Sequence, residues 1–114
     1  MTSPIYVPLV CASLYVVDGD TFWCDREKIR VMDIDAPETN QAKCESELAA
    51  GYEAKARLLM LLRTGYVGIE RRGLDKYGRT LGRLFVDGVP VADIMIRELL
   101  GRPYHGARRK SWCE

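Results

Sequence analysis

The stretch VVDGDTFWC, residues 16–24, decides the fold of this chain. Runs of β-branched and aromatic residues flank Asp18-Gly19-Asp20, and aspartate and glycine favour turns for backbone reasons. The same composition extends from Tyr6 to Ile34, with a second interruption at Cys24-Asp25-Arg26-Glu27. This punctuation predicts a three-stranded meander.

A helix follows the meander. Pro37 ends the third strand, because proline cannot donate a ladder hydrogen bond. From Glu45 to Thr64, apolar residues recur at spacings of four, four, three and three, which predicts an amphipathic helix ended by Gly65. Gly51 weakens this helix by ~1 kcal/mol relative to alanine. The apolar stripe consists of Leu48, Tyr52, Ala56, Leu59 and Leu62.

The second half of the chain predicts two strands and a short helix. The strands run from Tyr66 to Arg71 and from Thr80 to Val86, joined by a basic loop. Pro90 is suited to open the last helix, and Gly101 and Pro103 stop it. The order β-β-β-α-β-β-α predicts an α+β fold, mainly β, that is a five-stranded OB-fold barrel with two helices. One face of the last helix carries Val91, Ile94, Met95 and Leu99.

Length and composition limit the classes of protein. A chain of 114 residues predicts one small domain over residues 1–114, which excludes two-domain enzymes, and we expect a monomer. Hydrophobic residues make up 47% and charged residues 29%, as in a globular protein. No apolar stretch reaches the roughly 18 to 20 residues of a membrane span, so we expect no membrane partner. The first residues lack the pattern of a secretion signal, which predicts a cytoplasmic protein or an exported one whose signal was removed.

Charge is divided between the two halves of the chain. Residues 1–57 hold 6 basic and 10 acidic residues, whereas residues 58–114 hold 11 basic and 6 acidic residues. Such asymmetry suggests nucleic-acid contact, with cations favoured by the first half and phosphates by the second, although solvated faces alone also produce it.

Four cysteines, at positions 11, 24, 44 and 113, form no C-x-x-C pair. A structural zinc site is therefore not expected. Two disulfides and four free thiols both remain open. If disulfides form, we favour Cys44 with Cys113, because that bond ties the closing segment to the loop before the long helix.

Three polar clusters interrupt the barrel pattern, and each alone has an ordinary structural interpretation. Asp18-Gly19-Asp20-Thr21 suits a turn, Asp35-Ala36-Pro37-Glu38 suits a strand end, and Asp75-Lys76-Tyr77-Gly78-Arg79 suits a solvated loop. Together they supply what phosphodiester hydrolysis requires. Aspartate oxygens suit calcium, glutamate can accept a proton from water, and arginine binds two phosphate oxygens as a fork.

These clusters, in this order, resemble the staphylococcal nuclease family over roughly residues 14–104. The resemblance implies an OB-fold barrel that cleaves DNA and RNA with calcium by in-line attack of water and leaves 3′-phosphates. The matching segments are VVDGDT at 16–21, IR at 29–30, IDAPE at 34–38, DKYGR at 75–79 and LFVDG at 84–88.

The resemblance also implies a role for individual residues. Asp20 and Asp35 match the calcium carboxylates, and the main-chain carbonyl of Ala36 matches a further ligand. Many members have threonine at the position of Ala36, which leaves a backbone ligand intact. By the same pattern Asp18 lies behind the ligands, and Asp33 is a surface residue.

Further matches concern the substrate. Glu38 matches the general base or water-positioning group, and Arg30 and Arg79 match the pair that clamps the phosphate. Lys76 and Tyr77 match positions that contact a terminal phosphate. We name Tyr104 as a substrate-binding candidate that could stack on a base, although an aromatic residue near a chain end more often packs against the domain.

Two questions stay open at this stage. The closing Arg108-Arg109-Lys110 either guides the polyanion or is a solvated tail. The alternative to a nuclease is a catalytically inactive OB-fold module that binds nucleic acid or protein. The complete set Asp20, Arg30, Asp35, Glu38 and Arg79 favours the enzyme, because a pure binder would be free to lose members.

Overall fold

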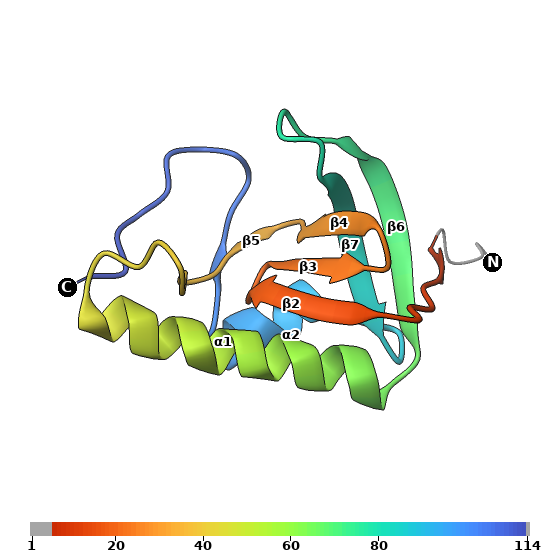
Figure 1. Cartoon of the computed structure of the whole chain (residues 1–114), viewed down its shortest axis with the longest axis horizontal. Coiled ribbons are helices and arrows are strands. Elements are labelled where there is room, and N and C mark those ends of the chain that lie inside the picture. The colour runs from red at the N-terminus through yellow and green to blue at the C-terminus, as the bar shows by residue number, and fades with distance from the viewer. Residues whose placement is uncertain (1–5, 114) are drawn as a thin grey trace.

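The computed structural model describes residues 6–113, so the expected domain limits at 1 and 114 lie outside it. The meander is confirmed: its three strands pair antiparallel in sequence order (Figure 1). Tyr15 lies opposite Trp23, and Trp23 lies opposite Lys28. The strands are β2 (Leu14–Asp18), β3 (Thr21–Cys24) and β4 (Glu27–Val31).

The remaining long strands, β6 (Val67–Leu74) and β7 (Thr80–Val86), form an antiparallel pair, and β7 lies parallel to β4. A short strand that the sequence did not predict, β1 (Val7–Pro8), pairs with β6. The sheet order is β1-β6-β7-β4-β3-β2, so both ends of the path belong to the segment Val7–Asp18. The sheet therefore curls back on itself, as the predicted α+β OB-type barrel requires.

Of three more short strands, two form a separate small sheet and one joins the main sheet. β5 (Ile34–Asp35) pairs with β9 (Arg102–Pro103), and β8 (Val89–Pro90) pairs with β7. The third meander strand ends at Val31, before the expected Ile34, because Asp33 turns the chain with a φ of 76°. The β5–β9 pair brings the last part of the chain beside Asp35.

Helix α1 (Glu45–Thr64) has the predicted bounds, and Leu59 and Leu62 of the predicted apolar stripe pack against the core, whereas the first part of the stripe does not. Leu48 and Tyr52 are 37% and 57% exposed, and the buried face instead carries Gly51, Ala54 and Leu58. Spacings of three and four fit neighbouring faces almost equally. The smaller residues face inward because the chain after β5 approaches the helix closely: a Cβ at Gly51 would lie 2.5 Å from the carbonyl oxygen of Glu38.

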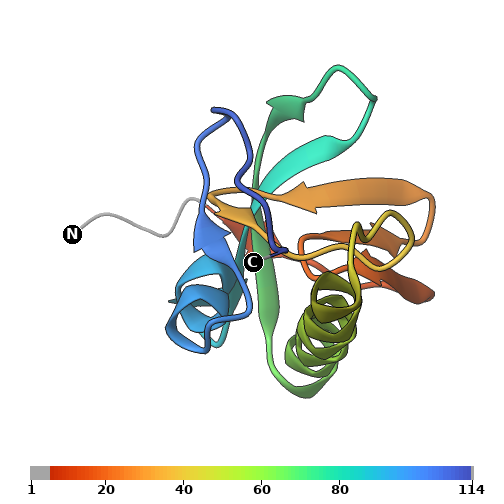
Figure 2. The same ribbon diagram turned by 90° about the vertical axis from the view of Figure 1, so that its left-hand side faces the viewer.

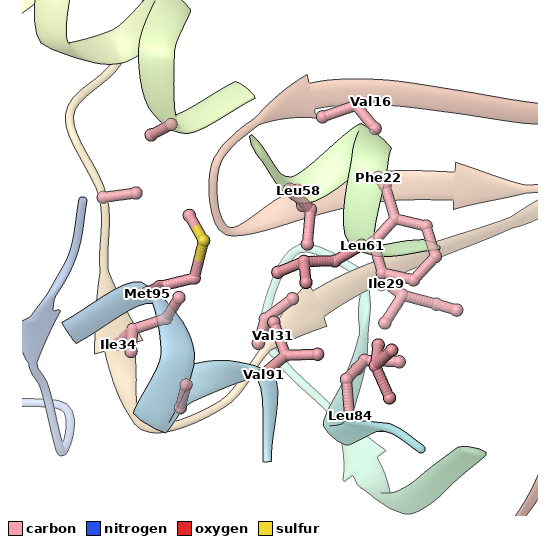
Figure 3. Close-up of a cluster of buried hydrophobic side chains, with 14 of the residues drawn as sticks. Val16, Phe22, Ile29, Val31, Ile34, Leu58, Leu61, Leu84, Val91 and Met95 are labelled. Carbon is pink, nitrogen blue, oxygen red and sulfur yellow. The ribbon is translucent and has the colours of Figure 1, made fainter. Parts of the chain in front are cut away.

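Helix α2 (Val91–Arg97) begins after Pro90 as predicted and is shorter than expected. Leu99 has a φ of 63° and is 84% exposed, so its placement on the buried face is wrong. Both helices lie on the same side of the strands (Figure 2). The core between the sheet and these helices is apolar (Figure 3). It includes Phe22, Ile29, Val31, Ile34, Leu58, Leu84, Val91 and Met95.

Two disulfides are present, Cys11–Cys24 and Cys44–Cys113. The second confirms the predicted pairing and joins the closing segment to the beginning of α1, where the chain end lies in Figure 1. Within residues 6–113, no helix combines the length and the apolar composition needed to cross a bilayer.

Candidate active site

The predicted site residues gather around one hollow of about 280 Å³ near the end of β2. It lies between the β2–β3 turn, the loop after β5, the β6–β7 loop and the closing segment. Asp35 and Ala36 are buried behind it, at 3% and 0% exposure. The lining residues are Asp18, Asp20, Thr21, Arg30, Glu38, Lys76, Tyr77, Arg79, Tyr104 and Arg109.

Asp20 is held in place by its neighbours on both oxygens. The Thr21 hydroxyl donates to Oδ1 at 2.9 Å, and the Ala36 backbone N–H donates to Oδ2 at 2.8 Å. Arg30 Nη2 lies 3.6 Å from the same Oδ2. The β2–β3 turn and the chain after β5 are thereby joined through one carboxylate, which explains how residues distant in sequence converge here.

Asp35 is partnered by the closing segment. Arg109 Nε lies 2.8 Å from Oδ1, and the Trp112 indole N–H donates to Oδ2 at 3.3 Å. Burial raises the pKa of Asp35; the charge of Arg109 opposes this shift, and repulsion from Asp20 adds to it. The ion pair is close but poorly aligned, since Oδ1 accepts no hydrogen bond from any group in the described part of the chain.

Glu38 is placed by helix α1. Its backbone N–H donates to Glu47 Oε2 at 3.2 Å, and the other oxygen of Glu47 accepts from the Lys43 N–H at 2.9 Å. The side chain of Glu38 pairs with Arg109 Nη2 at 3.1 Å. Burial raises the pKa of Glu38, Arg109 opposes this, and Asp18 raises it further.

Asp18 was expected behind the ligands, and it lines the hollow together with Asp20. It accepts hydrogen bonds from the backbone N–H and the hydroxyl of Thr39, both at 3.0 Å. Its pKa is raised by burial and by the charge of Asp20. Asp33 does not line this hollow, although it lines a second hollow of about 450 Å³ beside Arg30; it pairs with Arg83 at 3.0 Å and is partly exposed.

The two arginines that line the hollow come from β4 and from the β6–β7 loop. Arg30 donates to the carbonyls of Val31 and Ile34 at 2.6 and 3.0 Å, and its guanidinium lies 5.8 Å from the Tyr104 ring. Arg79 pairs with Asp75 at 2.7 Å. Arg79 is anchored through Nε, which leaves its terminal N–H groups available to a ligand, whereas Arg30 is held through Nη1 and faces Asp20 with Nη2.

Lys76 and Tyr77 stand at the mouth of the hollow. The Lys76 ammonium and the Arg79 guanidinium each lie 5.3 Å from the Tyr77 ring. Hydrogen bonds from Arg79 and Tyr77 fold the loop around Asp75 and lower its pKa, although burial alone would raise it. The loop therefore presents two cations and one aromatic ring together.

The donor set fits a hard cation. The carboxylates of Asp20 and Asp35 lie in one buried region, where the negative charge of Asp20 contributes to raising the pKa of Asp35. Oδ1 of Asp35 accepts no hydrogen bond from the described residues. Calcium accepts carboxylate and carbonyl oxygens together with waters in irregular geometry. Across residues 6–113, no cluster of three or more His, Cys, Asp or Glu side chains forms a ready metal site. The cation would thus depend on two carboxylates, the Ala36 carbonyl and water.

Several contacts at the site were not predicted from the sequence. From the sequence, the basic segment Arg108-Arg109-Lys110 could either guide the polyanion or be a solvated tail. In the structure, Arg109 pairs with two of the predicted site carboxylates. Trp112 and Glu47 were not considered. The predicted Cys44–Cys113 bond was the one signal for this arrangement, because it brings the closing segment beside α1.

The geometry defines an OB-fold with a cluster of carboxylates and arginines at one end. A profile of the staphylococcal nuclease homologue family matches residues 28–111, and the chain belongs to this family.

Among similar proteins is ParB of Escherichia coli, 33% identical over 91 residues, 76% of this chain and 48% of ParB. A micrococcal nuclease of Shigella flexneri is 39% identical over 74 residues, 61% of this chain and 38% of that protein. An uncharacterized endonuclease of Haemophilus influenzae is 34% identical over 80 residues, 66% of this chain and 41% of that protein. The chain spans less than half the length of these relatives.

Proposed function

We propose that this chain is a calcium-dependent nuclease that hydrolyses phosphodiester bonds of DNA and RNA. The observation that carries the proposal is the convergence of Asp20, Arg30, Glu38 and Arg79 on one hollow, with Asp35 directly behind it. The curated nuclease and endonuclease among its relatives support the same reaction class.

In this proposal Glu38 holds the attacking water and accepts its proton. The burial that raises the pKa of Glu38 makes its carboxylate a stronger base than an exposed glutamate. The backbone bond to Glu47 holds the loop that carries it. The attack proceeds in line with the leaving 5′ oxygen, which leaves a 3′-phosphate on the product.

Arg30 and Arg79 bind the non-bridging phosphate oxygens. Their bonds to the Ile34 carbonyl and to Asp75 orient the two guanidinium groups before substrate arrives. Such preorganised charge stabilises the transition state without reorganisation at the moment of reaction. Calcium bound by Asp20, Asp35 and the Ala36 carbonyl would supply further positive charge at the phosphate.

Lys76, Tyr77 and Tyr104 complete the substrate site. Tyr77 and Tyr104 also line a neighbouring hollow of about 450 Å³, which reaches Leu81 and His105. Aromatic rings around a space of this size suit a nucleoside. Lys76, at the entrance, suits a terminal phosphate.

A digestion assay tests this proposal. We expect single-stranded DNA to be cleaved with calcium and to remain intact with chelator. Glu38→Gln keeps the size of the side chain but not the base, and we expect turnover to fall about 10²- to 10⁴-fold with oligonucleotide binding retained. Cleavage that survives chelation would contradict the cation, and unchanged turnover would contradict the role of Glu38.

One observation favours a second candidate, an OB-fold module that binds nucleic acid without cleaving it. Arg109 already neutralises Asp35 and Glu38, as a structural ion pair would in a protein that needs no cation. The variant Arg109→Ala distinguishes the nuclease from the binding module. We expect an enzyme to remain active or gain activity in Arg109→Ala, whereas a pure binder stays inactive.

A further inference from the structure

An exposed aromatic pair lies on the outer face of the meander and does not line the hollow. Tyr15 on β2 and Trp23 on β3 are direct cross-strand partners, and they are 59% and 37% exposed. Their sequence neighbours Val16, Phe22 and Cys24 point inward and are buried. The two rings therefore stand side by side on the solvent face of the barrel.

A lysine ammonium group lies near each ring of this pair. Lys28, opposite Trp23 on β4, places its ammonium 5.6 Å from the Trp23 ring. Lys55 on α1 places its ammonium 5.8 Å from the Tyr15 ring. We call these four residues, Tyr15, Trp23, Lys28 and Lys55, the outer strip.

The acidic groups next to the outer strip are already engaged. Asp25, in the β3–β4 turn, accepts the backbone N–H of Ser13 at 2.8 Å. Glu27 binds Arg71 through two bonds of 2.8 Å, and its pKa is lowered by them. Glu27 is thus neutralised by Arg71, and the ammonium groups of Lys28 and Lys55 remain available to a polyanion.

The outer strip is continuous with the proposed active site. Lys28 and Arg30 lie two residues apart on β4, on either side of the fully buried Ile29, so both point outward. Two residues of a strand cover ~7 Å.

We propose that the outer strip is a binding track for single-stranded nucleic acid that leaves the active site at Arg30. Unpaired bases stack on Trp23 and Tyr15, while Lys28 and Lys55 contact the phosphates between them. Alternating aromatic rings and cations are the means by which proteins hold single strands without sequence preference. A duplex cannot use the track, because its bases are already stacked on each other.

This inference rests on the proposed function and names its substrate as single-stranded and longer than the hollow alone can hold. The test is a binding titration in chelator, with labelled oligothymidylate of about 12 nucleotides, within the range of OB-fold site sizes. We expect Trp23→Ala and Tyr15→Ala each to weaken this binding by about 10-fold. Binding of a dinucleotide, which fits in the hollow, should remain unchanged.

Two further variants separate stacking from folding. Trp23→Phe keeps an aromatic face and should bind nearly as wild type. Tyr66→Ala removes a tyrosine that is 89% exposed in the connection after α1, and it should leave oligonucleotide affinity unchanged. Lys28→Ala should flatten the dependence of affinity on salt concentration, because one phosphate contact is lost.

The outcomes distinguish this inference from the proposed function. If wild type binds both oligonucleotide and dinucleotide, and Trp23→Ala and Tyr15→Ala match it, the track is refuted and the active site stands. If wild type binds neither ligand, the track is refuted, and the digestion assay with calcium decides the proposed function separately. If the variants lose affinity for duplex as much as for single strands, the stacking interpretation is overturned.

Discussion

Arg109 Nε lies 2.8 Å from Asp35 Oδ1, in an ion pair between the closing segment and β5. The same guanidinium reaches Glu38 at 3.1 Å. A single cationic side chain therefore neutralises a proposed calcium ligand and the proposed base together. A calcium ion at the proposed site would compete with this guanidinium for Asp35.

Replacing Arg109 should strengthen cation binding. The Arg109 side chain is 42% exposed, so its pair with Asp35 contributes about 0.5–1 kcal/mol, and Arg109→Ala should lower the Kd for calcium roughly two- to five-fold. Isothermal titration calorimetry measures this directly. Arg108→Ala, which removes an exposed neighbour, is the control and should leave the Kd unchanged. A weaker affinity in Arg109→Ala would show that the guanidinium does not compete with the cation.

The Cys44–Cys113 bond should protect the closing segment from proteases. In a Cys44→Ser, Cys113→Ser double variant, we expect trypsin to cleave after Arg108, Arg109 or Lys110 several times faster, because the segment is no longer held at α1. Loss of a disulfide that closes so long a loop costs about 4 kcal/mol, so the digestion is run well below the unfolding temperature. Removing Cys11 and Cys24 instead should not accelerate these cuts. Equal rates in all three proteins would contradict the prediction.

Gly51→Ala should impair the site although alanine is the better helix former. Helix propensity alone would stabilise α1 by ~1 kcal/mol, but the new Cβ would meet the Glu38 carbonyl oxygen at 2.5 Å. We expect a lower melting temperature and a loss of turnover approaching 10²-fold, since ~1 Å of misplacement is enough for that. Ala49→Gly, on the exposed side of α1, should lower stability by a similar ~1 kcal/mol and leave turnover unchanged. A Gly51→Ala protein that is more stable and fully active would refute the close approach.

Asp18→Asn should stabilise the protein at neutral pH but not in acid. The pKa of Asp18 is raised above its ordinary 3.8 by burial, so its charged form is disfavoured in the folded state. Its contribution to stability is therefore complete below 3.8 and is lost as the pH rises through the raised value. Asparagine can keep the bonds from Thr39 and does not ionise, so the gain in melting temperature should be largest near pH 7 and vanish below pH 3.8.

For this variant, Asp18→Ala is the matched control. It removes both the charge and the acceptor of the two Thr39 bonds, and it should be less stable than Asp18→Asn at every pH. A gain in Asp18→Asn that is the same at pH 3 and pH 7 would contradict the raised pKa.

Much of the fold was predictable because local chemistry agrees with it. The turn at Asp18–Asp20 and the stop at Gly65 have backbone causes that are legible in the sequence, and they place the strands and α1 correctly. The buried face of α1 was not predictable, because a close approach between backbones selects Gly51 and Ala54 over the larger Leu48 and Tyr52. The periodicity of apolar residues does not indicate at which positions of a helix only a small residue fits.

The same contrast holds at the site. Asp20, Arg30 and Glu38 were predicted to lie together, and the structure brings them to one hollow. The pairing of Arg109 with Asp35 depends on the β5–β9 ladder and on a disulfide across 69 positions. Contacts between such distant segments leave no local pattern, which is why the function of the basic ending stayed open.

The disulfide at Cys113 also sets the strength of the Arg109 contact. Arg109 precedes the bonded cysteine by four residues, so its guanidinium remains near the carboxylates even when the ion pair opens. A short linker of this kind gives an effective concentration in the mM range. The contact is intramolecular, so diluting the protein does not weaken it, and an incoming ligand always faces the same local competitor.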